Sequence, residues 1–241
     1  MYELFYWPGL PGRGEFVRLA LEDTDTAYTD VARGEGGVRA MQRIMEGDGV
    51  IGPPPFAPPF LRDGELVLAQ VANILAYLAP RLGLVAADDA SRFRANQLQL
   101  TIADFLVEVH DTHHPIGSSL YYEDQKPEAL RRTHAFVTHR LPKYLGYFEK
   151  VVAGGGGFAL GGAHGYVDLS LFQVVEGLRY AFPRAMAVVE PTVPALVALR
   201  DRVAARPRLA AYLASPRRLA FNEHGIFRRY AELDVLPEAV R

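Results

Sequence analysis

The chain contains no cysteine among its 241 residues. A disulfide framework, a thiolate metal site and a cysteine nucleophile are therefore all excluded. Neither sign of charge is in clear excess, because 26 basic residues face 28 acidic ones and the formal net charge is -2. That balance disfavours nucleic acid or an anionic membrane surface as a partner, and it favours a small molecule or a second copy of the chain.

Long hydrophobic runs are also missing. The mostly apolar run from Val71 to Leu78 is far shorter than the ~20 residues that cross a bilayer. The beginning carries Glu3 and no basic stretch followed by an apolar segment, so no secretory signal is indicated and we expect a cytoplasmic protein. Hydrophobic residues make up 49% of the chain, which is enough for a sizeable core in one large domain or two ordinary ones.

The first eighty residues mix strand and helix patterns. Alternation predicts a first strand in which Tyr2, Leu4 and Tyr6 share one face. A later hairpin is expected to turn on Asp63 and Gly64. In chain order, the expected elements are a strand over 2–7, a helix over 14–23, a strand over 27–32, a loop, a hairpin over 60–68 and a helix from 71.

After residue 87 helical patterns replace strand patterns, separated by proline or glycine. Helices are expected over 91–110, 128–153, 168–180, 193–204 and 207–213. A small α/β unit followed by an all-helical unit predicts two domains, 1–80 and 87–241, joined around 80–86.

Tyr6 stands where the first strand passes through a Pro/Gly turn into a helix. A helix N-terminus favours anions, because its first N–H groups are unpaired and the helix dipole is positive there. A phenol at this point suits stabilising a thiolate. Since the chain has no cysteine, that sulfur would belong to another molecule. The alternative is an aromatic residue that only packs at the end of the strand.

A proline cluster precedes the hairpin and includes Pro53, Pro54, Pro55, Pro58 and Pro59. One interpretation is simply a stiff loop. The other is a cis peptide bond before Pro59, which would turn main-chain groups outward to face a ligand.

Several short patterns occur along the chain: Tyr6, Gly12-Arg13, Glu15, Arg18, Pro59-Phe60-Leu61, Asp63-Gly64, Leu68-Ala69-Gln70, Ile74 to Leu78, Tyr166 to Leu169 and Ala205 to Leu213. Together they resemble the cytosolic glutathione transferases, and most closely their tyrosine-type classes (sigma, mu, pi and alpha). This resemblance extends over essentially the whole chain. It implies an α/β plus all-α fold, with a thioredoxin-like N-terminal domain and an all-helical C-terminal domain.

The resemblance gives Tyr6 a catalytic role, in which its hydroxyl donates a hydrogen bond to the sulfur of glutathione. A thiol with a pKa near ~8.5 is mostly protonated at neutral pH, and a donor aimed at the thiolate lowers that pKa. Arg13 would add positive potential beside the helix start. It could instead pair with a neighbouring carboxylate such as Glu15.

Other positions implied to bind glutathione depart from the family pattern. Gln70 matches the glutamine that holds the γ-glutamyl end, but Val71 replaces the usual serine. Backbone N–H groups at that helix start would still be available to the carboxylate. Pro58 and Pro59 lie where the cysteinyl unit is bound, and Pro58 lacks the N–H that normally pairs there.

The glycyl end has the weakest match. Val38 and Gln42 replace the usual tryptophan and lysine, with Arg39 and Arg43 as substitutes. Gln97 falls near the position from which some classes lend an acidic residue to the partner subunit.

By analogy alone, several side chains are expected to line a pocket for an electrophile, although each could equally belong to the core: Trp7, Leu10, Phe105, His113, Tyr121, Tyr122 and Phe227. A metal site at His110, Asp111, His113 and His114 is disfavoured, because Pro115 ends the helix there and no further ligands are evident. Asp168 with Gly165 resembles a helix-capping box, which is a folding role.

The leading functional hypothesis is a glutathione transferase that uses glutathione as co-substrate, needs no metal and acts on hydrophobic electrophiles as a homodimer. One alternative uses the same thiolate for peroxide reduction or double-bond isomerisation. The other is a non-catalytic binding or scaffold protein that retains the fold.

Overall fold

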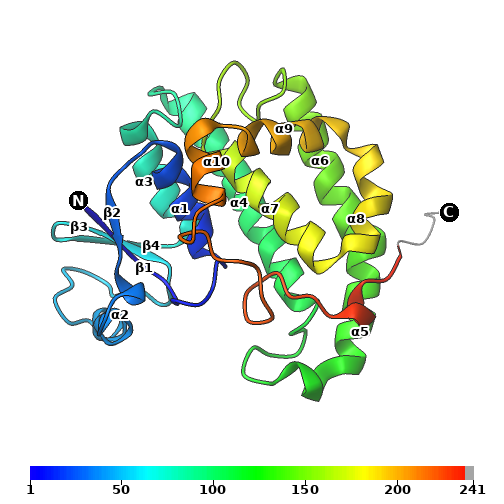
Figure 1. Ribbon diagram of the computed structural model, residues 1–241, viewed down its shortest axis with the longest axis horizontal. Coiled ribbons are helices and arrows are strands. Elements are labelled where there is room, and N and C mark those ends of the chain that lie inside the picture. The colour runs from blue at the N-terminus through cyan, green and yellow to red at the C-terminus, as the bar shows by residue number, and fades with distance from the viewer. Residues whose placement is uncertain (237–241) are drawn as a thin grey trace. The chain divides into compact units, whose positions relative to one another are not determined.

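The computed structural model describes residues 1–236, which form two compact units (Figure 1). The first comprises Met1–Asn96 and Ala204–Ala220, and the second comprises Gln97–Val203 with the chain from Phe221 onward. These units do not follow the expected division at 80–86. The chain returns to the first unit because α10 (Pro207–Leu213) packs on α1 (Gly14–Asp23).

The described residues of the first unit contain a four-stranded sheet with the order β2-β1-β3-β4. Its strands are β1 (Tyr2–Phe5), β2 (Tyr28–Asp30), β3 (Phe60–Asp63) and β4 (Leu66–Ala69). β1 runs parallel to β2 and antiparallel to β3, and β3 runs antiparallel to β4. This mixed sheet with helices on both faces is the expected thioredoxin-like domain.

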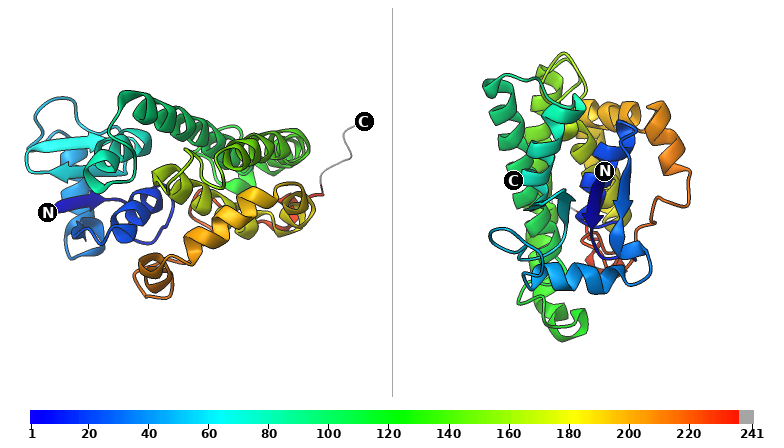
Figure 2. Two further views of the ribbon diagram at one scale, coloured as in Figure 1. Left: turned by 90° about the horizontal axis from the view of Figure 1, so that it is seen from above. Right: turned by 90° about the vertical axis from the view of Figure 1, so that its left-hand side faces the viewer.

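Alternating residues of β1 divide the core of this unit in two, because neighbouring side chains of a strand point to opposite faces. Leu4 packs with residues of α1 and α3 (Val71–Leu82), whereas Phe5 packs with residues of α2 (Gly37–Met45). Helices α1 and α3 therefore cover one face of the sheet and α2 covers the other (Figures 1 and 2).

Two expectations for this unit were wrong. The segment that contains α2 was expected to be a loop, yet Val38, Met41 and Met45 recur at helical spacing and line its inner side. The hairpin turns on Gly64 and Glu65 rather than on Asp63 and Gly64, since Asp63 still pairs with Leu66. Gly64 takes the positive φ of 62° that the first residue of such a tight turn requires.

Among the described residues, all regular secondary structure of the second unit is helical. Its helices are the larger part of α4 (Asp89–Asp111), α5 (Lys126–Ala135), α6 (Leu141–Gly154), α7 (Tyr166–Ala181), α8 (Pro183–Val189) and most of α9 (Pro194–Ala204). Short 3-10 turns occur at Val31–Arg33, Tyr122–Gln125, Glu190–Thr192 and Ala231–Leu233. Helix α8 was not expected from the sequence.

The single helix expected over 128–153 is interrupted by a π-helical turn, Phe136–Arg140. Pro142 explains the interruption, because proline has no N–H and its ring clashes with the carbonyl four residues earlier. The neighbouring N–H of Leu141 bonds to Phe136, five residues back, as in a π-helix. None of the described helices is long and apolar enough to cross a membrane.

Candidate active site

At one end of the strands, three loop segments lie side by side. The register places Phe5 opposite Phe60, and Phe60 opposite Ala69. The chain leaves the sheet after this row in β1 and β4, and it enters the sheet at this row in β3. The residues that adjoin the row are Tyr6, Pro59 and Gln70. Tyr6 therefore lies at the same end of the sheet as Pro59 and Gln70, although more than fifty residues separate it from either in sequence.

Tyr6 is only 5% exposed and lies directly after β1. Its hydroxyl oxygen accepts a hydrogen bond from the backbone N–H of Arg13 at 2.9 Å. The two glycines that flank Arg13 lie against the ring, since a Cβ added at Gly12 would be 2.2 Å from the phenol oxygen and one at Gly14 would be 2.6 Å from ring carbons. The Gly12-Arg13-Gly14 sequence therefore makes room for the phenol.

Burial raises the pKa of the Tyr6 phenol above its usual value. The hydrogen bond from the Arg13 N–H and the charges of Arg13 and Arg18 act in the opposite direction but do not outweigh burial. The phenol consequently keeps its proton at neutral pH. Because its oxygen already accepts from Arg13, that proton can be donated to a further acceptor.

Arg13 stands at the N-cap of α1, where no side chain caps the helix. The sequence also allowed an ion pair between Arg13 and Glu15. In the structure the Glu15 carboxylate contacts Arg18, Tyr212 and Arg218 instead. Beside the phenol, Trp7 is 37% exposed and Leu10 is half-buried. Together they provide apolar surface in the same turn.

The peptide bond between Pro58 and Pro59 is cis, which confirms the sharper of the two interpretations of the proline cluster. Gln70 has φ 70° and ψ 122°, a sparsely populated conformation for a residue other than glycine. Strained backbone of this kind concentrates at functional sites. Gln70 is exposed and precedes Val71, the first residue of α3, whose N-terminus has no side-chain cap.

The residues expected near the glycyl end lie on α2. Gln42 and Arg43 are both exposed, and Arg43 forms an ion pair with Asp48. Arg39 is exposed as well, whereas Val38 packs against the core cluster of this face. The polar positions of α2 are thus accessible to a ligand.

The remaining site candidates belong to the second unit. Gln97 is exposed on α4, and Tyr121 is 79% exposed just before a 3-10 turn. Phe105 is fully buried and stacks on Phe136 and Tyr144. That packing favours the core alternative for Phe105.

His113 is also buried, and its Nε2 lies 2.8 Å from the carbonyl oxygen of Ile226. Burial lowers the pKa of His113 to about 2, so the ring is neutral and its Nε2–H donates to that carbonyl. His113 thereby ties down the segment around Ile226. Within the described residues, no group of three or more His, Cys, Asp or Glu side chains is arranged to hold a metal ion.

Comparisons with known proteins find similarity to glutathione S-transferases. A family model described as "Glutathione S-transferase, C-terminal domain" matches residues 110–216. Glutathione S-transferase P 1 of Xenopus laevis is 26% identical over 222 residues, which cover 90% of this chain and 93% of that protein. The chain is therefore similar to glutathione S-transferases over most of its length.

Solved structures support the fold. The pi-class glutathione S-transferase of Onchocerca volvulus aligns with a TM-score of 0.68 and 23% identity over 88% of this chain and 91% of that chain. Prostaglandin synthase D of Nilaparvata lugens aligns with a TM-score of 0.70 and 17% identity over 90% of this chain and 98% of that chain. These likenesses fit a thioredoxin-like N-terminal domain followed by an all-helical C-terminal domain in this chain.

Sequence reasoning missed the contacts that join Glu15, Arg18 and Tyr212. Glu15 was considered only as part of a family pattern and as a partner for Arg13, Arg18 only as part of that pattern, and Tyr212 only as part of the segment Ala205 to Leu213. The spacing of Glu15 and Arg18, three residues apart on a helix, was the one signal that they pair. Nothing in the sequence indicated that Tyr212 joins them.

Proposed function

We propose that this protein is a tyrosine-type glutathione transferase that conjugates glutathione to hydrophobic electrophiles. The observation that carries the proposal is the meeting of Tyr6, cis-Pro59 and Gln70 at one end of the sheet, with the protonated Tyr6 hydroxyl held by the Arg13 N–H. The similarity to glutathione S-transferases supports glutathione as the substrate, and the Tyr6 hydroxyl is a suitable donor for its sulfur.

In the proposed reaction, the thiol of bound glutathione loses its proton to solvent and the Tyr6 hydroxyl donates a hydrogen bond to the resulting thiolate. The positive end of α1 and the Arg13 guanidinium favour the same negative charge. The thiolate then forms a carbon–sulfur bond to an electrophilic carbon, and the leaving group departs with its electron pair. Trp7 and Leu10 offer apolar surface beside the phenol for that electrophile.

The rest of glutathione is assigned to the neighbouring segments. The α-carboxylate of the γ-glutamyl unit is placed at the start of α3, where Gln70 and the N–H groups of the first turn are free of a side-chain cap. The cysteinyl unit is placed against the cis bond, where the Pro58 carbonyl can accept its N–H. Gln42 and Arg43 of α2 are assigned to the glycyl carboxylate.

A homodimer forms part of the proposal. Helix α4 carries an exposed apolar row at seven-residue spacing, with Phe93 71%, Leu100 50% and Val107 51% exposed. Large apolar side chains aligned on one helix in this way commonly mark a protein interface. A sedimentation or sizing experiment with Leu100→Glu and Val107→Glu should yield monomer where the wild type yields dimer.

The test of the function combines retention on immobilised glutathione with conjugation of an aromatic halide. Retention with turnover that Tyr6→Phe largely removes supports the transferase. Retention without turnover in either protein supports the scaffold alternative, and failure of the wild type to be retained contradicts both. Peroxide reduction and double-bond isomerisation, measured in parallel with the same two proteins, separate the enzymatic alternatives.

A further inference from the structure

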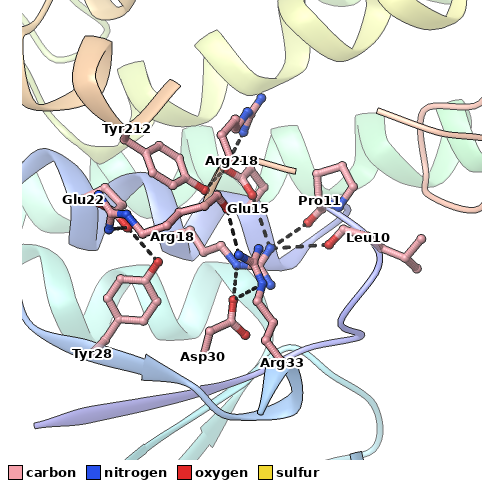
Figure 3. Close-up of polar contacts among 11 residues, drawn as sticks. Leu10, Pro11, Glu15, Arg18, Glu22, Tyr28, Asp30, Arg33, Tyr212 and Arg218 are labelled. Carbon is pink, nitrogen blue, oxygen red and sulfur yellow. Dashed lines mark hydrogen bonds and ion pairs between the residues drawn. The ribbon is translucent and has the colours of Figure 1, made fainter. Parts of the chain in front are cut away.

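A cluster of buried charges in the first unit contacts the turn at Leu10 and Pro11 (Figure 3). At its centre Arg18 has a fully buried side chain. The Arg18 guanidinium lies 2.6 Å from a carboxylate oxygen of Asp30 and 3.2 Å from one of Glu15. Arg33 contacts the same Asp30 oxygen at 2.8 Å. A buried arginine held by two carboxylates is fixed in place, since moving it would separate buried opposite charges.

Arg18 also holds the turn that carries the phenol's hydrogen-bond donor. Its Nη1 donates to the carbonyl oxygens of Pro11 at 3.3 Å and Leu10 at 3.5 Å. The Glu15 N–H donates to the same Pro11 carbonyl at 2.9 Å. Because Pro11 lies only two residues before Arg13, fixing its carbonyl fixes the direction of the Arg13 N–H that points at the Tyr6 oxygen.

Helix α10 and the segment that follows it also contact the cluster. The Tyr212 hydroxyl donates to Glu15 Oε1 at 2.6 Å, and Arg218 pairs with the same oxygen (Figure 3). Tyr212 is completely buried, and burial followed by the charge of Glu15 raises the pKa of its phenol, so it remains a donor. A residue almost two hundred positions away in sequence therefore sets the orientation of the Glu15 carboxylate.

We propose that Tyr212 is a positioning residue for thiolate activation, acting through Glu15 and Arg18 to hold the Leu10–Arg13 turn against the Tyr6 phenol. Without its hydroxyl, the Glu15 carboxylate loses a hydrogen bond and can rotate away from Arg18. Arg18 then holds the Leu10 and Pro11 carbonyls less firmly. The catalytic consequence rests on the function proposed above, whereas the effect on the turn does not.

The chain offers a matched control. Tyr28 donates from its hydroxyl to Glu22 at 2.9 Å, and Glu22 lies near the opposite end of α1. Tyr28→Phe and Tyr212→Phe therefore each remove one phenol–carboxylate hydrogen bond between α1 and another part of the same unit. Only Tyr212→Phe removes one that leads to the Tyr6 turn.

The first measurement needs no ligand and follows hydrogen exchange of the Arg13 and Glu15 amides by NMR. The quantity compared is the ratio of each amide's exchange rate to that of the Leu61 amide in the core of the sheet. In Tyr212→Phe we expect this ratio to rise about tenfold for both amides, which is the change that loss of one buried hydrogen bond brings. In Tyr28→Phe the ratio should stay as in the wild type. Equal ratios in all three proteins would overturn the proposal. Arg218→Gln, which removes the other partner of Glu15 Oε1, should shift the ratio in the same direction as Tyr212→Phe.

The second measurement titrates the ultraviolet absorbance of the thiolate of glutathione bound to each variant. Tyr212→Phe should raise the apparent pKa of that thiol and lower kcat, while KM for glutathione and the pKa in Tyr28→Phe stay at their wild-type values. An unchanged thiol pKa in a Tyr212→Phe protein that binds glutathione would overturn the catalytic role of Tyr212. A wild type that binds no glutathione but shows the exchange difference would overturn the proposed function and leave the positioning of the turn intact.

Discussion

The starts of helices α7 and α1 show two ways in which this protein treats a helix N-terminus. At α7 the Asp168 carboxylate accepts from the N–H of Gly165 at 2.7 Å and from the N–H of Ala159 at 2.8 Å. At α1 no side chain caps the first turn, and the N–H of Arg13 donates to the Tyr6 phenol. Both starts are buried or half-buried, so exposure does not explain the difference.

The difference separates a structural helix start from a reactive one. Asp168 brings its own negative charge and leaves no demand for an external anion. Tyr6 brings a neutral, protonated group, so the positive end of α1 and the phenolic proton both remain available for a negative charge. The same distinction predicts which variants change stability and which change chemistry.

Tyr6→Phe should have the largest effect on chemistry. Removing the single donor to a developing anion costs about 10²–10³ in turnover. Stability should fall by only about 1 kcal/mol, because the Arg13 N–H loses its acceptor while the ring still fills its place beside Gly12 and Gly14. Turnover with an aromatic halide measures the effect on chemistry, and a urea unfolding curve measures the effect on stability. A variant that retains most of the wild-type turnover would contradict the reactive role of the α1 start.

Asp168→Ala should have the largest effect on stability. Two backbone N–H groups would lose a charged, buried acceptor, which costs about 2–3 kcal/mol in the free energy of unfolding. Thiolate activation should be unchanged in the protein that remains folded, because Asp168 belongs to the other unit. Denaturant unfolding combined with kcat per folded molecule measures the two separately. A large loss of kcat at unchanged stability would contradict a purely structural role for the start of α7.

Gly14→Ala should displace the Tyr6 phenol while leaving its hydroxyl group in the protein. The new Cβ would lie 2.6 Å from ring carbons of Tyr6, so the ring must shift. A shift of a reacting group by a fraction of an ångström should lower kcat/KM about tenfold. Gly146→Ala in α6 is the matched control, since its Cβ would meet nothing within 4 Å. The control should keep full activity and gain up to about 1 kcal/mol in stability.

Arg13→Gln should have the smallest effect. The backbone N–H that holds Tyr6 remains, and only the side-chain charge is lost. Because Arg13 is half-buried and its field is screened by solvent, we expect a loss of about two- to fivefold in kcat/KM. The loss should shrink as salt is added. Insensitivity to salt would indicate that Arg13 acts through a contact rather than through its charge.

Local patterns predicted the elements that hold the site. Helix α1 spans Gly14–Asp23 as expected, because a compact apolar face follows a Pro/Gly turn. Helix α2 was missed, although Val38, Met41 and Met45 recur at helical spacing. The turn at Gly64-Glu65 was misplaced by one residue, since Asp-Gly and Gly-Glu both satisfy the turn pattern and only the pairing of Asp63 decides between them.

Contacts between distant segments could not be predicted. Tyr212 and Glu15 are 197 residues apart, and neither periodicity nor turn chemistry links positions at that distance. The meeting of Tyr6, Pro59 and Gln70 depends on the strand order β1-β3-β4, which no local pattern contains. The resemblance to a known family selected these residues, and the register of the sheet explains why they belong together.

The titration of the glutathione thiol in the bound state tests the central claim most directly. With the wild type, the apparent pKa of that thiol should lie well below the ~8.5 of a free thiol, and in Tyr6→Phe it should return toward the free value. A bound thiol whose pKa is the same in both proteins would show that Tyr6 does not stabilise the thiolate.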